Sequence, residues 1–159
     1  MCNSTIPMKG KIHSLNISSK KGIPKTPVAE AKAIEDFGLE NDIHAQPGIR
    51  QVSLLAIESI NRQKECAKVK KKDIDLKPGD FAENITTSGI DLKKLKIGDR
   101  LKAGDEVILE ISKIGKECHI GCAIYQKLGD CIMPREGIFA KIIKGGTLKK
   151  GDILETFDC

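Results

Sequence analysis

Aromatic residues are the scarcest class in this sequence of 159 residues, which has no tryptophan, one tyrosine and four phenylalanines. Surfaces for single-stranded nucleic acid stack bases on aromatic side chains, so this composition disfavours nucleic acid as a partner. No apolar run approaches the roughly eighteen residues that a membrane helix needs, which argues against a membrane-spanning protein. The first residues show no basic start followed by an apolar stretch, so we expect no signal peptide and a cytoplasmic location.

Common cofactor motifs are also missing. The sequence has no Gly-x-Gly-x-x-Gly, no P-loop and no lysine-centred pyridoxal motif, so nothing predicts a nucleotide cofactor or pyridoxal chemistry. Zinc is disfavoured, because structural zinc sites usually use two tight cysteine pairs and residues 118–131 offer one loose pair. Cys2, Cys66 and Cys159 have no companion group, and in the cytoplasm we expect all six cysteines to be free thiols.

Charge of both signs is plentiful. Lysine and arginine number 27 against 22 acidic residues, and 27 − 22 gives a net charge of +5. The lysines gather at 68–72, 93–96 and 148–150, a pattern that is more typical of solvated turns and faces than of a phosphate-bearing partner. The length suits one domain that spans residues 1–159.

The dipeptide Gly-Asp occurs five times, at 79–80, 98–99, 104–105, 129–130 and 151–152. Glycine supplies the positive φ of tight turns and aspartate bonds back to the local backbone. Short strand-like runs lie between these turns, at residues 11–17, 50–55, 106–112 and 138–143. Short strands with regularly spaced turns predict a mainly β fold, in which an antiparallel sheet forms a closed or partly closed barrel.

Helices are a minor part of the predicted fold. Residues 56–70 place apolar side chains on one helical face, which predicts one substantial helix. Shorter helical turns are expected at 92–97 and 123–128. Residues 18–28 contain two prolines and a glycine, so we expect neither strand nor helix there.

The densest group of reactive side chains lies in residues 113–122, which contain lysines, a histidine and two cysteines. Cys122 directly precedes the helix expected at 123–128, where unpaired N–H groups and the helix dipole stabilise a thiolate. This position favours Cys122 as a nucleophile or metal ligand, with Cys118 assisting. The simpler alternative is that both cysteines are small buried hydrophobes.

Two further stretches are rich in polar side chains. Asp42 and His44 would point to one face of an extended segment, but as a general pattern this favours a structural histidine over a ligand. Residues 78–89 carry Glu83, Asn84 and several hydroxyl groups, and the plain interpretation of this stretch is the polar end of a hairpin.

Taken in order, these stretches resemble the MOSC family, the C-terminal domain of molybdenum cofactor sulfurases, in its short stand-alone form. The matching pieces are Lys-Thr-Pro-Val at 25–28, Gly38 with Asp-Ile-His at 42–44, Arg-Gln-Val-Ser-Leu-Leu at 50–55, Pro-Gly-Asp-Phe-Ala-Glu-Asn-Ile at 78–85, Ile-Gly-Asp at 97–99, Gly-Lys-Glu-Cys-His-Ile-Gly-Cys at 115–122 and Met-Pro-Arg-Glu-Gly-Ile-Phe-Ala at 133–140 with Gly-Gly at 145–146. The resemblance covers about residues 8–155. Asn41 stands where the family pattern has glycine, and asparagine tolerates the positive φ that such a turn needs.

The resemblance implies a β-barrel and a role with the molybdenum cofactor, a pterin dithiolene that carries a phosphate, or with a tungsten analogue. It also implies a cysteine that accepts sulfur as a persulfide or ligates molybdenum, and Cys122 corresponds best to that cysteine. A soft thiolate suits both tasks. With Cys122, the candidate cofactor-binding residues are His44, Arg50, Asn84 and Arg100. Arg50 is the preferred phosphate partner, with Arg100 and Arg135 behind it.

Three functions remain open at this point. The first is a binding or carrier module that holds molybdopterin or sulfur and exchanges it with cofactor-biosynthesis or sulfur-donor proteins. The second is a small sulfurtransferase, or a component of a molybdenum-dependent reductase, that uses the same cysteine catalytically. The larger reductase members carry an additional N-terminal barrel, which favours the first function. The third is a basic barrel that binds RNA or protein, and the scarcity of aromatic residues counts against it.

Overall fold

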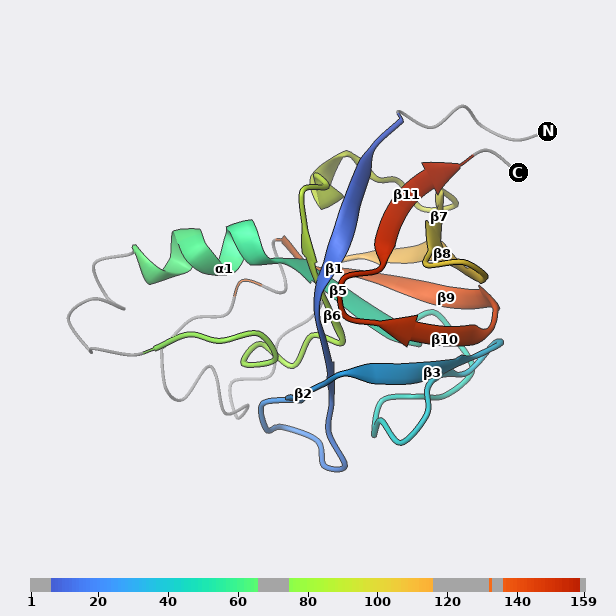
Figure 1. Ribbon diagram of the computed structural model, residues 1–159. Coiled ribbons are helices and arrows are strands. Elements are labelled where there is room, and N and C mark those ends of the chain that lie inside the picture. The colour runs from blue at the N-terminus through green and yellow to red at the C-terminus, as the bar shows by residue number, and fades with distance from the viewer. Residues whose placement is uncertain (1–6, 66–74, 116–131, 133–135, 158–159) are drawn as a thin grey trace.

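The computed structural model describes residues 7–65, 75–115, 132 and 136–157. Its main sheet contains β1 (Lys9–Ile17), β5 (Val52–Ala56), β6 (Ile85–Ser88), β7 (Arg100–Ala103), β8 (Val107–Ile114), β9 (Ile138–Lys144) and β11 (Ile153–Phe157). The strands follow one another in the order β11-β7-β8-β9-β5-β6-β1, and β1 pairs back with β11 to close a barrel (Figure 1). The predicted mainly β, barrel-like fold is therefore confirmed.

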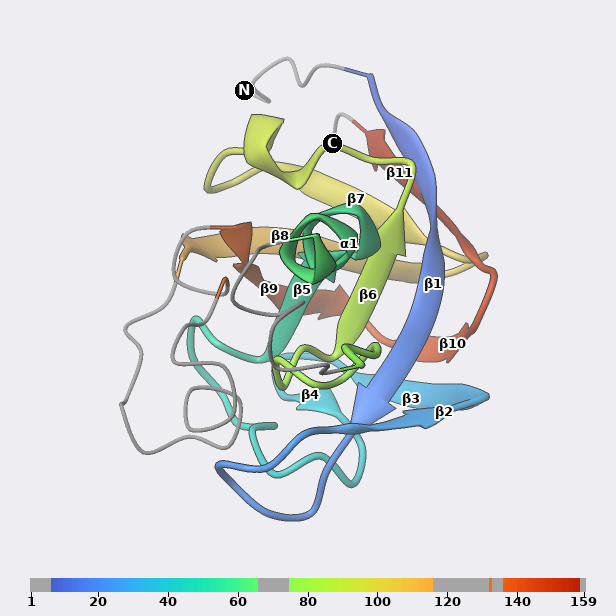
Figure 2. The same ribbon diagram turned by 90° about the vertical axis from the view of Figure 1, so that its left-hand side faces the viewer.

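One strand pair departs from the expected antiparallel arrangement. β5 and β6 are parallel, whereas the other pairs in the described part of the chain are antiparallel. Parallel neighbours need a crossover connection, and α1 (Ile57–Lys64) lies in the connection between them. The helix projects from one side of the barrel (Figure 1) and is seen end-on in Figure 2.

A second, three-stranded sheet contains β10 (Gly146–Lys149), β3 (Glu30–Ile34) and β4 (Gly38–Leu39). It lies at the lower end of the barrel in both ribbon views (Figures 1 and 2). Buried residues of this sheet belong to the same hydrophobic cluster as the barrel core: Ala31, Ala33, Leu39 and Leu148 pack with the barrel interior. The small sheet therefore extends the barrel core.

The expectation that residues 18–28 contain no strand is wrong at one end. β2 (Thr26–Val28) pairs with β1, and Pro27 lies opposite Asn16. Proline cannot donate to a sheet ladder, but it is tolerated on an edge strand, and β2 is the outermost strand of its sheet.

The helical predictions have mixed outcomes. α1 begins at Ile57, buries Ile60, and has Glu65 as its C-cap, while residues 66–70 of the predicted helix lie outside the described residues. The short turn near 92–97 is a 3-10 helix, η1 (Leu92–Lys94), and the helix expected at 123–128 lies outside the described part. No helix among the described residues is long and apolar enough to cross a membrane.

The Gly-Asp turns behave as predicted wherever the structure describes them. Gly79, Gly98, Gly104 and Gly151 all have positive φ, between 66° and 97°. Three of these turns share the sequence Lys-x-Gly-Asp, at 77–80, 96–99 and 149–152. In each, the Asp carboxylate accepts the Lys backbone N–H at 2.8 Å, and the Asp N–H donates to the Lys carbonyl. We refer to these three as the Lys-x-Gly-Asp turns.

Candidate functional site

A buried ion pair lies at the lower end of the barrel. Lys25, just before β2, places its Nζ 2.7 Å from Asp42 Oδ1, and neither side chain is exposed to solvent. Ser18 supports the pair, because its backbone N–H donates to Asp42 Oδ1 at 3.1 Å and its hydroxyl lies 3.4 Å from Lys25 Nζ. Charges removed from water need partners in this way, since an unpaired buried charge is strongly destabilising.

His44 completes this group. Its Nδ1 lies 2.9 Å from Lys25 Nζ, its backbone N–H donates to Asp42 Oδ2 at 3.3 Å, and its side chain is half-buried. Asp42 and His44 do approach one another as predicted, but residues 41–45 form turns rather than an extended segment. Asn41 has φ 70°, so the positive φ predicted at that position is confirmed. We call Lys25, Asp42 and His44 the Lys-Asp-His group.

Asn84 lies in a buried polar network beside this group. Its Oδ1 accepts the Ser53 backbone N–H at 3.1 Å, and its Nδ2 donates to the Asn16 carbonyl at 3.2 Å. Asn16 in turn donates from Nδ2 to Thr86 Oγ1 at 3.0 Å. Asn84 therefore ties β1 to β5 immediately before β6 begins.

The interpretation of residues 78–89 as a polar hairpin end is wrong, because Glu83 and Asn84 are almost completely buried and β6 runs parallel to β5. Glu83 Oε2 accepts the Gly79 N–H at 3.0 Å and the Thr86 hydroxyl at 2.7 Å. Its other oxygen, Oε1, has no hydrogen-bond partner among the described residues. Burial raises the pKa of Glu83 to about 7, despite the opposing hydrogen bonds from Gly79 and Thr86.

Gly79 connects Glu83 to the Lys-Asp-His group. Its carbonyl accepts the Lys25 backbone N–H at 2.8 Å, while its own N–H donates to Glu83. A Cβ at position 79 would lie 2.1 Å from the Lys25 carbonyl oxygen, so only glycine allows this approach. The turn at 77–80 thus fixes the backbone from which the Lys25 side chain extends.

Arg50 lies in the loop that follows His44 and reaches the barrel wall. Its guanidinium stands 5.9 Å from the centroid of the Phe139 ring on β9, and the residue is exposed. The neighbouring carbonyl of Ile49 accepts a hydrogen bond from Ser112 on β8. The loop that carries His44 and Arg50 is therefore fastened to β8 and β9.

Arg100 lies elsewhere. It is on β7 and its Nε donates to Glu110 Oε2 on β8 at 3.0 Å. β7 is labelled in the upper part of the barrel in both ribbon views, above β2 and β3 (Figures 1 and 2). His44 thus belongs to the Lys-Asp-His group, whereas the contacts of Arg50 and Arg100 are with β8 and β9: Arg50 stands over Phe139 and Arg100 pairs with Glu110, two residues before Ser112.

Cys118, Cys122 and Arg135 lie outside the described residues. The described chain leaves β8 at Gly115 and resumes at Glu136 and Gly137, and the Gly115 N–H donates to the Gly137 carbonyl at 2.9 Å. Both ends of the segment that contains the cysteines are therefore held side by side, next to the strands that Arg50 and Ile49 contact.

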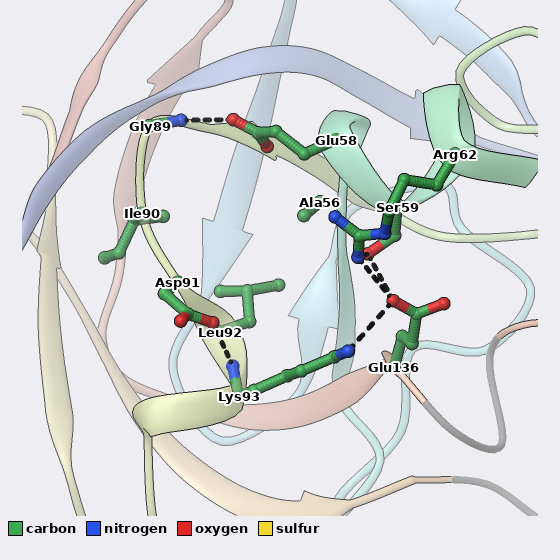
Figure 3. A pocket seen from close by; sticks show the side chains of 10 residues that line it. All are labelled: Ala56, Glu58, Ser59, Arg62, Gly89, Ile90, Asp91, Leu92, Lys93 and Glu136. Atoms are coloured by element: carbon green, nitrogen blue, oxygen red, sulfur yellow. Dashed lines mark hydrogen bonds and ion pairs between the residues drawn. The ribbon is translucent and has the colours of Figure 1, made fainter.

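Glu136 also forms one wall of a pocket of about 420 Å³ between α1 and η1 (Figure 3). Its Oε1 receives Ser59 Oγ at 2.9 Å, Arg62 Nη2 at 2.6 Å and Lys93 Nζ at 3.3 Å. Partial burial opposes ionisation, but these three donors lower the pKa of Glu136 below its usual value. The charges of Glu136, Arg62 and Lys93 in this pocket are therefore paired with one another.

Among the described residues, no group of three or more histidine, cysteine, aspartate or glutamate side chains is placed to hold a metal ion. For the phosphate of a pterin, the exposed guanidinium of Arg50 is a chemically suitable partner.

Comparison with known proteins settles the family. The model of the MOSC domain matches residues 40–155, more than two thirds of the chain. The chain belongs to the MOSC family. The match includes His44, Arg50 and Asn84, as well as both cysteines of residues 113–122, whereas Lys25 precedes it. No curated protein matches this MOSC chain significantly.

Several solved structures share the fold of this MOSC protein. YuaD from Bacillus subtilis has a TM-score of 0.77 at 19% identity, with 100% of both chains covered. YiiM from Geobacillus stearothermophilus has a TM-score of 0.68 at 20% identity over 93% of this chain and 75% of that one. YiiM from Escherichia coli has a TM-score of 0.67 at 16% identity over 94% and 70%. At such low identity these likenesses show the fold alone.

Lys25 and Glu83 were not singled out by the sequence as site residues. Lys25 lies among residues with turn-forming neighbours, and its partner Asp42 is 17 positions away. Glu83 lies in a stretch of polar residues, and such a stretch predicts a segment exposed to solvent. The available signal was the MOSC-like pattern itself, which contains both residues.

Proposed function

We propose that this MOSC protein is a binding or carrier module of molybdenum cofactor metabolism, which holds a molybdopterin-type cofactor or sulfur destined for it. The observation that carries the proposal is the MOSC match, because it contains His44, Arg50 and the cysteine pair in one continuous region. The structure supports it by placing His44 and Arg50 in one loop that contacts β8 and β9, the strands from which the cysteine segment extends.

The roles follow from the chemistry of each side chain. Arg50 binds the phosphate, because a guanidinium forms paired, charge-assisted hydrogen bonds to oxyanions. His44 donates a hydrogen bond to an anionic atom of the same ligand. Asn84 acts indirectly by holding β1 and β5 beside the Lys-Asp-His group. The cofactor, when bound, supplies the metal and its dithiolene sulfurs.

Cys122 supplies the thiolate in this proposal. It carries sulfur as a persulfide or ligates molybdenum, and Cys118 assists. The sequence supports this order, because Cys122 directly precedes the helix expected at 123–128 and Cys118 does not.

Mass spectrometry of the protein purified under native conditions tests the proposal. We expect either a bound pterin or a cysteine that carries one additional sulfur atom. Incubation with a persulfide donor and then with an acceptor protein extends the test: stoichiometric loading indicates a carrier, and repeated turnover indicates a sulfurtransferase. A protein that neither retains a pterin nor accepts sulfur from a persulfide donor would contradict the proposal.

A further inference from the structure

β8 carries an irregularity near its end, beside the loop that holds Arg50. Its pairing with β9 shifts by one residue between Ile111 and Lys113, so Ser112 is an extra residue, as in a β-bulge. Without this shift Lys113 would lie opposite Ile138. The extra residue places Lys113 opposite Phe139 instead.

The shift decides which face of the sheet Lys113 occupies. Ile138 and Ala140 belong to the barrel core, so Phe139 between them points to the outer face, since strand side chains alternate. Residues directly opposite one another in an antiparallel pair point to the same face. Lys113 therefore shares the outer face with the Phe139 ring, whereas opposite Ile138 it would face the core.

Arg50 reaches the same ring from the loop. Its guanidinium stands 5.9 Å from the centroid of Phe139. The hydroxyl of Ser112 donates to the Ile49 carbonyl, so the extra residue of β8 also fastens the loop beside Arg50. One irregularity in β8 thus brings the side chains of Lys113 and Arg50 to one aromatic ring.

Neither cation has a carboxylate partner in the part of the chain that the structure describes. Arg50 is exposed and Lys113 is half-buried. Two like charges beside one ring repel each other, and an anion between them relieves this repulsion. A guanidinium fork and an ammonium group together suit a phosphate dianion in both charge and hydrogen-bond donors. Cations elsewhere in the described chain do pair with carboxylates, among them Lys25, Arg62, Lys93 and Arg100.

We infer that Arg50 and Lys113 form an oxyanion site on the outer face of β8 and β9, which takes a phosphomonoester group. Ser53 lies opposite Phe139 on the other side of β9, and its backbone N–H and hydroxyl both donate to Asn84 Oδ1, so Asn84 borders this site. The oxyanion site concerns the protein alone. That the phosphate belongs to a molybdopterin-type cofactor rests on the proposed function.

Titration of the ligand-free protein with inorganic phosphate, followed by NMR at constant pH and ionic strength, tests the oxyanion site. We expect saturable shifts of the Arg50 Nε–H signal and of the Lys113 side-chain signals, which are assigned by their loss in Arg50→Met and Lys113→Met. A wild-type protein in which neither side chain responds to phosphate would overturn the inference.

Two lysine variants separate a defined site from general surface charge. Lys113→Met removes the charge but keeps the apolar stem, and we expect phosphate binding to weaken by about 10- to 100-fold, the effect of a lost hydrogen bond to a charged group. Lys141→Met is the matched control, because Lys141 lies two residues after Phe139 on β9 but opposite the carboxylate of Glu110. Its phosphate affinity should equal that of the wild type, and equal weakening by both variants would overturn the site.

A pair of substitutions at Ser112 tests the role of the irregularity. Ser112→Ala removes the hydroxyl that holds the Ile49 carbonyl but removes no charge. We expect it to weaken phosphate binding because Arg50 is held less firmly, and we expect Ser112→Thr to restore the affinity. Unchanged phosphate binding by Ser112→Ala would show that this bond does not position Arg50.

Molybdopterin cofactor released from a molybdoenzyme, before and after treatment with a phosphatase, tests whether the cofactor phosphate occupies the site. We expect the wild type to prefer the phosphorylated form, and this preference to shrink by about tenfold in Lys113→Met. Equal binding of both forms by the wild type would overturn this assignment and leave the proposed function standing. A wild type that binds inorganic phosphate at Arg50 and Lys113 but neither form of the cofactor would count against cofactor binding, while the oxyanion site would stand.

Discussion

Glu83 shows what one buried carboxyl does to this protein. It is fully buried, one of its oxygens lacks a partner among the described residues, and no lysine or arginine bonds to it there. Burial disfavours its charged form, which is why its pKa is raised to about 7 from an ordinary value of 4.5. The folded protein therefore retains this proton at pH values at which the unfolded chain releases it.

The raised pKa of Glu83 makes the free energy of unfolding depend on pH. Between pH 4.5 and about 7 the folded state binds more protons at Glu83 than the unfolded state, so the free energy of unfolding falls as pH rises. The loss should reach about 3 kcal/mol, the energy of a shift of two to three pKa units. Urea unfolding at several pH values measures it. Glu83→Gln should flatten the curve in this interval, and a variant with the same slope as the wild type would assign the effect to other groups.

Arg50 and Arg100 form a test pair, because both were predicted from sequence and the structure gives them different partners: Arg50 stands over the Phe139 ring, whereas Arg100 is paired with Glu110. Arg50→Ala should weaken pterin binding by about 1–3 kcal/mol, the range for a lost charged hydrogen bond. Arg100→Ala is the matched control, and it should leave the affinity unchanged. Calorimetric titration measures both, and the reverse result would move the phosphate site to β7.

In the sequence, Cys122 directly precedes the helix expected at 123–128, whereas Cys118 lies four residues earlier. A thiol pKa lowered from about 8.5 to about 6.5 changes the thiolate from a few per cent to most of the population at pH 7. Alkylation followed by peptide mass mapping should therefore label Cys122 first as pH rises. Cys122→Ser should abolish sulfur or metal loading, and Cys118→Ser should only reduce it. Loading that survives in Cys122→Ser but not in Cys118→Ser would exchange their roles.

At the scale of elements, the three Lys-x-Gly-Asp turns have the same local structure but different surroundings. Their glycines have φ of 92°, 97° and 93°, at Gly79, Gly98 and Gly151. A Cβ at Gly98 or Gly151 would meet nothing within 4 Å, whereas at Gly79 it would meet the Lys25 backbone. The turns at 96–99 and 149–152 bond through their backbones to Ile111 and Ile12, whereas the turn at 77–80 bonds to Lys25 and so positions the Lys-Asp-His group.

This difference predicts a graded series of alanine substitutions. Gly98→Ala and Gly151→Ala should each cost about 1–2 kcal/mol of stability, because alanine pays the strain of the left-handed conformation. Gly79→Ala should cost more and should also displace Lys25, changing the NMR signals of His44. Thermal unfolding and the His44 spectrum measure the two effects. Equal losses at all three positions would mean that the contact with Lys25 relaxes without strain.

The sequence predicts the elements that depend on local patterns and misses those that depend on distant partners. Turn chemistry and alternation located β1, β5, β8 and β9, because glycine, aspartate and apolar spacing act within a few residues. β6 was not predicted, because three of its four residues (Ile-Thr-Thr-Ser) are polar and suggest an exposed segment. In the structure most of them are buried, and Thr86 bonds to Asn16 and Glu83. The parallel pairing of β5 and β6 was not predicted either, although the helix that connects them was.

In the candidate site, too, some residues could be predicted from the sequence and others could not. His44, Arg50 and Asn84 were predicted through the family pattern, and the structure adds how they are held. Lys25 could not be predicted as a partner of His44, because nothing in a single sequence states which carboxylate neutralises a buried lysine. Its environment depends on the turn at 77–80, more than fifty residues further along the chain.

At the scale of the whole molecule, the barrel depends on the pairing of its first and last strands. β1 and β11 pair from Lys9 with Glu155 to Lys11 with Ile153, and the Met8 N–H donates to Thr156 Oγ1. β11 also pairs with β7, so one strand completes two ladders. Almost the entire chain separates the partners across this seam, which makes the closing contact costly in chain entropy.

The order in which the ribosome synthesises the strands decides when β1 and β11 can pair. While the chain is being synthesised, one edge of β7 and the Lys9–Lys11 part of β1 stay unpaired, because the strand that pairs with both is translated after them. The nascent protein therefore passes through an open sheet whose hydrogen-bonding groups are available to other chains. The interval between translation of β7 and release of β11 is when this protein is most exposed to aggregation and has most need of a chaperone.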